Sequence, residues 1–117
     1  MVEGLGMKKN KYNAKKVELD GYKFDSKKEA KRYSELKLLQ RAGGLTDLKL
    51  QVPFEIVPKT DRFRAVKYIA DFTYRVPGHD ILFCEDVKGS RKGAAYQMFK
   101  IKQKIMYYKL GIEVFEV

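Results

Sequence analysis

Two aspartates of this sequence, Asp71 and Asp86, are spaced so that they can act together. Residues 64–76 and 81–88 each predict a strand, because aromatic and aliphatic side chains dominate them, and Pro77–Asp80 predicts a four-residue hairpin loop between them. Counting back from that loop places Asp71 directly opposite Asp86, where Cβ atoms are about 5 Å apart. Two carboxylates so close repel each other unless one is protonated or a cation lies between them. A divalent metal such as Mg²⁺, which prefers oxygen ligands, resolves that repulsion.

Lys88 is the third residue of this group. Side chains alternate along a strand, so Asp86 and Lys88 project from one face, and Glu85 and Val87 project from the other. A lysine there can hold or help deprotonate an attacking water, or stabilise charge that develops on a phosphate. The alternative is a structural salt bridge between Lys88 and either aspartate. A bulge or a different loop would bring Glu85, rather than Asp86, opposite Asp71.

The start of the chain predicts a flexible arm followed by a β-hairpin. Residues 1–14 mix Gly, Lys and Asn without periodicity, which predicts a basic arm and leaves residues 15–117 as one domain. Within that domain, segments 15–19 and 22–24 flank Asp20-Gly21, a dipeptide favoured in two-residue turns because both central positions need positive φ.

A helix follows, and it carries a further acid. Ser26 and Glu29 have the spacing of a capping box, and the helix should run to about Ala42. At helical spacing Glu29 shares a face with Tyr33 and Leu36, so it points toward the apolar side, where an unpaired carboxylate is costly. Glu29 is therefore a third candidate acid for the site. The alternative is that it only completes the capping box.

The remaining elements are predicted from periodicity. Alternating apolar residues over 48–56 indicate a strand, and residues 112–117 indicate a last short one. Between them, residues 93–110 predict an amphipathic helix. Its apolar face is predicted to hold Met98, Ile101, Ile105 and Tyr108. After the opening hairpin the element order is thus α-β-β-β-α-β, an α/β fold.

The charge predicts a polyanionic partner. Twenty-five Lys and Arg against fifteen Asp and Glu give a net charge of +10. Residues 1–41 carry twelve basic and six acidic side chains, residues 88–109 carry seven basic and no acidic ones, and residues 42–87 carry six basic and seven acidic ones. Two positive segments therefore flank an acidic centre, which suits a protein that binds phosphates. The alternative is an ordinary solvated basic surface.

The composition also predicts the compartment. Cys84 is the single cysteine, which excludes an intrachain disulfide and fits a reducing environment. No stretch approaches the roughly 18 apolar residues of a membrane span, and the basic start lacks the apolar run of a signal peptide. We therefore expect a cytoplasmic protein without a membrane partner.

The element order and the short motifs together resemble the PD-(D/E)XK nuclease superfamily. An acid on the first helix, Asp71 in Ile-Ala-Asp-Phe, and Glu85 to Lys88 as Glu-Asp-Val-Lys carry that likeness. Four blocks in this order resemble more narrowly a phage-encoded branch of small proteins similar to Holliday junction resolvases. These blocks are Lys11 to Lys16, Phe24 to Ala30, Tyr68 to Phe72 and Glu85 to Gly89.

The resemblance implies a restriction-endonuclease-like αβββαβ core, with a central mixed sheet and flanking helices, after the short hairpin. Asp71 matches the first acid of the motif, Asp86 the second and Lys88 the lysine, and Glu29 matches the helix acid. The implied catalytic residues are these four, and the implied ligands of Mg²⁺ or Mn²⁺ are Asp71, Asp86, Glu29 and Val87. The sequence departs from the pattern in two places, because Glu85 stands beside Asp86 and Ala70 replaces the proline before Asp71.

The implied function is an endonuclease that hydrolyses DNA phosphodiester bonds, with four-way junctions as the favoured substrate. The residues expected to contact DNA are Lys15, Lys16, Lys27, Arg91, Lys92, Gln97, Lys100 and Lys104. Cutting two symmetry-related strands implies a two-fold homodimer, acting in the host cytoplasm if the protein is phage-encoded. The alternatives are a nuclease for single-stranded, flap or specific duplex DNA, and a non-catalytic basic DNA-binding protein. For the helix residues, a solvated face is a further alternative.

Overall fold

The computed structural model describes residues 16–117. Contacts divide the chain into two compact units, Met1–Glu35 and Leu36–Val117, and each is described by itself. The predicted arm at residues 1–14, and with it Lys15, lies outside the described residues. None of the helices in the described part combines the length and the apolar character needed to cross a membrane.

The first unit contains the predicted hairpin. Strands β2 (Val17–Leu19) and β3 (Tyr22–Phe24) pair antiparallel, and Leu19 pairs with Tyr22 across the turn. The two turn residues have φ values of 53° at Asp20 and 81° at Gly21. Both are left-handed, as the Asp-Gly dipeptide predicted.

Helix α1 (Lys27–Arg41) begins in this unit and starts as its sequence predicted. The Glu29 N–H donates to Ser26 Oγ at 3.1 Å, so the serine caps the helix. Glu29 itself is buried, as its place beside Tyr33 on the helix predicted. The Tyr33 ring packs 5.1 Å from that of Phe24, and its hydroxyl donates to Asp20 at 2.9 Å, which holds the hairpin on the helix.

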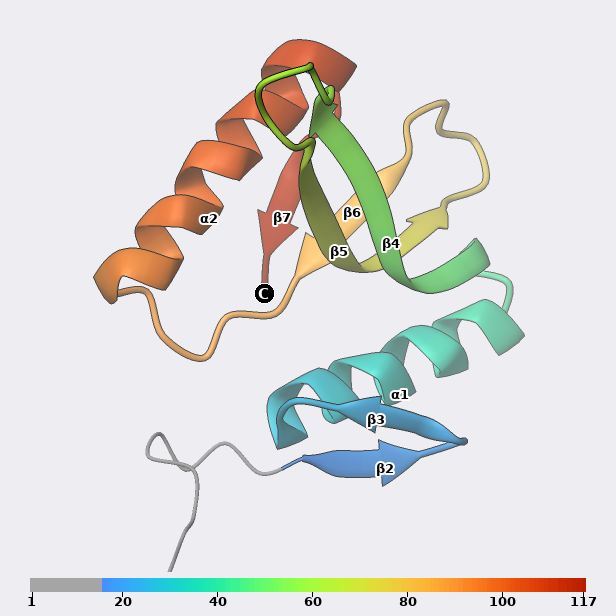
Figure 1. Cartoon of the computed structure of the whole chain (residues 1–117). Coiled ribbons are helices and arrows are strands. Elements are labelled where there is room, and N and C mark those ends of the chain that lie inside the picture. Colours follow the sequence, from blue (N-terminus) through green and yellow to red (C-terminus); the bar gives the residue numbers. More distant parts are fainter. Residues whose placement is uncertain (1–15) are drawn as a thin grey trace, which may run out of the picture. The chain divides into compact units, whose positions relative to one another are not determined.

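In the second unit α1 ends and leads into the sheet. Gly43 takes φ 85°, and the Gly44 N–H bonds the Leu39 carbonyl at 2.8 Å, so glycine ends the helix as predicted. Four strands follow in spatial order β4-β5-β6-β7 (Figure 1). Their bounds are β4 Thr46–Val57, β5 Val66–Arg75, β6 Phe83–Asp86 and β7 Val114–Glu116.

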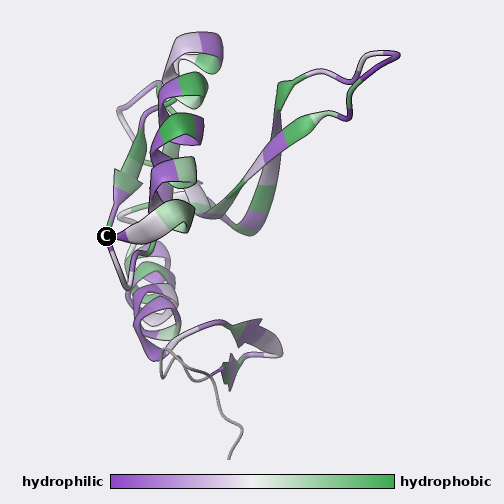
Figure 2. Ribbon diagram, turned by 60° about the vertical axis from the view of Figure 1, so that its left-hand side comes forward, coloured by the Kyte–Doolittle hydropathy of each residue, from purple (hydrophilic) through white to green (hydrophobic). Residues whose placement is uncertain are grey.

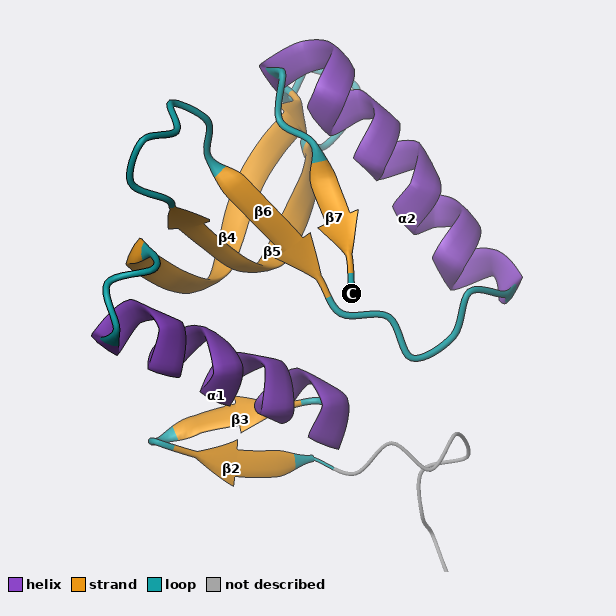
Figure 3. Ribbon diagram, turned by 180° about the vertical axis from the view of Figure 1, so that it is seen from behind, coloured by secondary structure: helices purple, strands orange, loops and turns teal. Residues whose placement is uncertain are grey.

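The four-stranded sheet is mixed. Strands β4, β5 and β6 pair antiparallel, and β7 joins β6 in parallel. Helix α2 (Gly93–Ile105) and the π-helical turn η1 (Met106–Leu110) connect β6 to β7, and α2 runs beside β7 (Figure 3). A parallel pair needs such a crossover, usually a helix. The predicted α/β class and the element order α-β-β-β-α-β are therefore confirmed.

The predicted buried face of α2 is wrong. Phe99 and Met106 are the buried residues of this helical segment, and they pack in one core with Cys84 and Ala70 of the sheet. Of the predicted face only Ile105 lies against this core, whereas the other three residues are exposed. Met98 is 53%, Ile101 51% and Tyr108 89% exposed.

Candidate active site

The strand register brings Asp71 and Asp86 together. Strands β5 and β6 pair Tyr74 with Phe83 and Phe72 with Glu85. This is the register that the count from the hairpin loop predicted, and its regular pairs end at Phe72 and Glu85, one residue before Asp71 and Asp86. The two aspartates are close enough for the charge of Asp86 to raise the pKa of Asp71. Glu85 instead faces Phe72, and its carboxylate accepts a buried hydrogen bond of 2.5 Å from the Tyr74 hydroxyl. Asp86, rather than Glu85, is therefore the acid beside Asp71.

Asp71 is half-buried and held by two donors. Its Oδ2 accepts the Val87 main-chain N–H at 2.8 Å, and its Oδ1 accepts the Gln51 amide at 3.3 Å. Burial first, and then the charge of Asp86, raise the pKa of Asp71 to about 6, although the hydrogen bonds from Val87 and Gln51 and the charge of Lys88 act to lower it. Near neutral pH this carboxylate is thus an energetically costly anion next to a second acid.

A local distortion of the β4–β5 hairpin positions Asp71. Tyr68 and Ala70 pack in one core with Cys84, and Cys84 pairs with Thr73 of β5. Strict alternation would place Thr73 on the opposite face of β5 from Tyr68 and Ala70. Alternation along β5 must therefore shift between Ala70 and Thr73, where Asp71 lies. Gln51, which the register places opposite Asp71, has a left-handed φ of 52°. The loop end of this hairpin reaches away from α2 (Figure 2).

The strain at Gln51 marks the site in a way that the sequence did not show. A non-glycine residue with positive φ costs energy, and such residues cluster at functional sites. Glutamine is not a residue that favours this conformation, so no local signal predicted it. Its side-chain amide nevertheless donates to the Asp71 carboxylate, so the exposed Gln51 is a positioning residue of the candidate site.

Asp86 and Lys88 form the second half of the site. The Tyr68 hydroxyl donates to Asp86 Oδ2 at 2.5 Å, and Lys88 Nζ lies 2.9 Å from Asp86 Oδ1. The same ammonium lies 3.7 Å from the centre of the Phe99 ring, so both the Asp86 carboxylate and the face of this ring hold the ammonium in place. The salt bridge foreseen as the alternative role of Lys88 is present, and it fixes the lysine beside the acid.

Lys88 lies beyond the end of β6, which is shorter than predicted. The strand stops at Asp86 because the chain then turns toward α2. The Lys88 N–H still bonds the Val117 carbonyl, and the Val117 N–H bonds the Asp86 carbonyl, both at 3.0 Å. These two bonds continue the pairing between the β6 and β7 segments past the regular ladder, and they keep Lys88 near Asp86.

Asp86 and Lys88 line a pocket of about 290 Å³ between β5 and α2. Lys67 from β5 and Lys102 from α2 also line it, and neither was among the predicted contacts. The remaining lining residues are Tyr68, Ile69, Ala95, Met98 and Phe99. The predicted DNA contacts Gln97, Lys100 and Lys104 are not among the residues that line this pocket.

Several predicted DNA contacts have protein partners. Arg91 and Lys100 both bond the Glu116 carboxylate, at 3.1 and 2.9 Å. Lys16 pairs with Asp25 at 3.1 Å on the surface. The other predicted contacts within the described residues are exposed, namely Lys27, Lys92, Gln97 and Lys104. The predicted stripe on α2 is thus divided, since Lys100 is turned toward β7.

The donor set fits a hard divalent cation held by few protein ligands. Asp71 and Asp86 offer carboxylate oxygens, and Mg²⁺ is commonly bound by one or two carboxylates with water and phosphate. Within residues 16–117 there is no group of three or more His, Cys, Asp or Glu residues arranged for a metal. Glu29 belongs to the first unit, and Val87 could bind a cation only through its main-chain carbonyl oxygen, while its N–H donates to Asp71. Cys84 is buried, which raises its thiol pKa to about 12.

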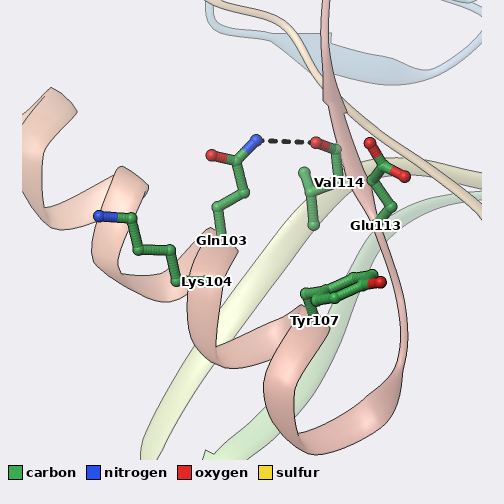
Figure 4. Close-up of a pocket in the computed structure, with 5 residues that line it drawn as sticks. All are labelled: Gln103, Lys104, Tyr107, Glu113 and Val114. Carbon is green, nitrogen blue, oxygen red and sulfur yellow. Dashed lines mark hydrogen bonds between the residues drawn. The ribbon is translucent and has the colours of Figure 1, made fainter.

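A second pocket, of about 430 Å³, lies between the α2–η1 segment and β7. Its lining residues are Gln103, Lys104, Tyr107, Glu113 and Val114 (Figure 4). The Gln103 amide donates to the Val114 carbonyl at 2.8 Å, so the helix covers a main-chain group of the outermost strand. This pocket has one carboxylate, Glu113, as the pocket beside Lys88 has one, Asp86. We place the candidate site at Asp71 and Asp86 because the charge of Asp86 acts on Asp71.

Fold and site define a small α/β protein that presents two facing aspartates and a lysine from paired strands of a mixed sheet. The chain belongs to the family described as protein of unknown function DUF1064, whose pattern matches residues 9–115. Neither a curated protein nor a solved structure matches it.

Proposed function

We propose that this protein is a metal-dependent endonuclease that hydrolyses DNA phosphodiester bonds. The observation that supports it most is the grouping at the end of the paired strands: the charge of Asp86 acts on Asp71, and Lys88 Nζ lies 2.9 Å from Asp86 Oδ1. Two acids and a lysine at one point of a basic protein suit the cleavage of a polyanion. The likeness of these residues to the PD-(D/E)XK motif agrees with this proposal, and the restriction-endonuclease-like topology is part of it.

The acids have distinct surroundings in this proposal. Asp71 and Asp86 would hold Mg²⁺ or Mn²⁺, which supplies Lewis-acid stabilisation of the phosphate charge. Gln51 and the Val87 N–H orient Asp71, while the Tyr68 hydroxyl orients Asp86. Each acid thus has a fixed rotamer before substrate binds, which lowers the ordering cost of catalysis.

Lys88 is the proposed proton-handling or charge-stabilising residue. Its ammonium is half-buried between Asp86 and the Phe99 ring, and these two contacts hold it in place. From there it can hold an attacking water or stabilise charge on the phosphate. Glu29, a buried acid of the first unit, is proposed as a further acid of this site on the strength of the motif resemblance.

The preferred substrate in this proposal is a four-way DNA junction. The four sequence blocks that resemble the resolvase-like branch support it, and such an enzyme would act as a two-fold homodimer so that two strands are cut symmetrically. The net charge of +10 supports binding to DNA in general.

The decisive experiment measures cleavage of a labelled four-way junction and a matched linear duplex, with Mg²⁺ and with chelator. The wild type should cut only with metal, and Asp86→Asn and Asp71→Asn should each lose at least a hundredfold in rate. Asp61→Asn is the matched control, because Asp61 is an exposed acid in the loop between β4 and β5. It should cut like the wild type.

The same assay separates the alternatives. Equal cutting of junction and duplex would refute the junction preference and leave a nuclease of other specificity. No metal-dependent cutting on any DNA, together with chelator-resistant binding, would refute the nuclease and favour a non-catalytic DNA-binding protein.

A further inference from the structure

The pocket beside Asp86 and Lys88 is lined by residues of β5 and of α2. On β5, Lys67 and Ile69 are two residues apart and share a strand face, while on α2 Met98 and Lys102 are one helical turn apart. The other lining residues from these two elements are Tyr68, Ala95 and Phe99. Each element therefore brings one lysine together with apolar or aromatic residues to the pocket.

The two lysines are available to an anion. Within residues 16–117, neither Lys67 nor Lys102 takes part in an ion pair, in contrast to Lys88 and Lys100, which hold Asp86 and Glu116. Glu55 faces Lys67 across the β4–β5 ladder, yet no ion pair joins them. Asp86 is the single acid of the pocket and already has Lys88 and Tyr68 as partners. Lysines of this kind are typical phosphate ligands.

The apolar side chains of the pocket indicate a ligand that has apolar faces as well as a phosphate. Ile69 and Met98 are each 53% exposed, although both border a pocket. A phosphate gains nothing from them, whereas the faces of sugar and base pack well on apolar and aromatic side chains. The pocket volume of about 290 Å³ lies at the lower end of ligand pockets, near 300 Å³, which suits one nucleotide and not a stacked base pair.

We propose that this pocket binds one unpaired nucleotide of a DNA substrate, with Lys67 and Lys102 on its phosphates and Ile69 and Met98 against its sugar and base. This inference rests on the proposed function, because it takes the DNA as the substrate of the adjacent acids. It adds that the enzyme recognises a strand whose bases are not all paired, such as the strand at a junction or flap.

The test measures binding without cleavage. Fluorescence anisotropy of a labelled oligothymidine in chelator gives the Kd of the wild type as a function of salt. The double variant Lys67→Ala/Lys102→Ala should bind about tenfold more weakly, and its salt slope should fall by about 1.4, since each phosphate contact with a single strand contributes about 0.7.

Lys59→Ala/Lys109→Ala is the matched control, because it removes the same charge from exposed lysines outside the pocket. An equal loss of affinity and slope in both double variants would overturn the proposal in favour of a diffuse electrostatic surface. Circular dichroism spectra identical to that of the wild type confirm that each variant is folded.

A third variant tests the nucleotide part. Ile69→Ser/Met98→Ser should weaken binding of oligothymidine about fivefold or more and leave the salt slope unchanged, because no charge is removed. Unchanged affinity would overturn the assignment of a base and sugar site. The binding experiments are done in chelator, so they test the nucleotide pocket even if the nuclease proposal fails. A wild type that binds oligothymidine as expected but does not cut DNA with Mg²⁺ would refute the nuclease proposal alone.

Discussion

At the scale of single residues, the environment of Asp71 destabilises its ionised form. Burial and the neighbouring Asp86 raise its pKa to about 6, above the ordinary 3.8. In the metal-free protein, folding therefore favours the protonated form of the Asp71 carboxyl group. The stability that this provides is complete below about pH 4 and is lost as the pH rises through about 6.

Asp71→Asn should remove this dependence. Asparagine keeps an oxygen that can accept the Val87 N–H but carries no charge, so the metal-free variant should be more stable than the wild type at pH 7, by on the order of 1–3 kcal/mol. The difference should shrink toward pH 4. Urea unfolding at pH 4, 5, 6 and 7 in chelator measures both. A variant less stable than the wild type at pH 7 would show that the Asp71 carboxylate is not strained.

The site residues differ in how far the sequence could predict them. The register of β5 and β6 could be predicted because a hairpin loop fixes the register of its two strands, and the observed pairs from Tyr74–Phe83 to Phe72–Glu85 agree with it. Tyr68 and Gln51 could not be found in this way, because a hydroxyl or amide that orients an acid has no spacing of its own. Lys67 could not be predicted as a residue of the pocket, because its neighbours there come from α2, far along the chain, and the strand pattern gives no signal of that contact.

At the scale of elements, Glu116 joins β7 to α2. Its carboxylate accepts from Lys100 at 2.9 Å, Tyr96 at 2.8 Å and Arg91 at 3.1 Å. These donors, Lys100 first, lower the pKa of Glu116 to about 2. The stability that this interaction provides is present above the unfolded value near 4.5 and is lost as the pH falls toward about 2.

Glu116→Gln should therefore destabilise the protein at pH 7 by about 1 kcal/mol. The full pKa shift would give more, but solvent screens the partly exposed lysine and arginine, so we discount it. The destabilisation should be equal at pH 5 and pH 7 and should diminish below about pH 4. Chemical denaturation at these pH values measures it. An effect that grows at low pH would contradict the assigned charge interaction.

The buried face of α2 gives a second prediction at this scale. Met106 is fully buried and Tyr108 is 89% exposed, whereas the periodicity of the sequence assigned Tyr108 to the core. Met106→Ala should cost about 2–5 kcal/mol, while Tyr108→Ala should stay within about 0.5 kcal/mol. Urea unfolding of the two variants compares them directly. The reverse order would restore the face that the sequence predicted.

The helix face could not be chosen from the sequence because α2 and η1 carry two stripes at three- and four-residue steps. Met98, Ile101, Ile105 and Tyr108 form an unbroken apolar stripe. The buried stripe runs through Tyr96, Phe99 and Met106 and is interrupted by Gln103. That glutamine belongs there because its amide reaches the Val114 carbonyl of β7, a tertiary contact without a local signal.

Elements set by local chemistry were predicted closely. The Asp20-Gly21 turn and the Ser26 cap depend on residues within four positions of each other, and both are present. Strand β6 was predicted to extend to Lys88 and ends at Asp86, because the chain leaves the sheet before its apolar pattern stops. Strand ends depend on partners that the pattern does not contain.

At the scale of the whole molecule, a cation at Asp71 and Asp86 would couple binding to folding. A ligand that binds the folded form alone stabilises it by about 2.7 kcal/mol at a hundred times its Kd. The gain should be larger at pH 7 than at pH 5, because Asp71 must lose its proton to bind metal and its pKa is raised to about 6.

Adding Mg²⁺ to the chelated protein should thus raise its melting temperature at pH 7, by less at pH 5, and not at all in Asp71→Asn/Asp86→Asn. Differential scanning calorimetry at both pH values measures this, and Asp61→Asn, which alters an exposed loop acid, should respond like the wild type. Because the readout is unfolding, it does not depend on having the right DNA. Equal shifts in wild type and double variant would place the cation elsewhere on the chain, and Asp71 and Asp86 would then lose their assignment as metal ligands.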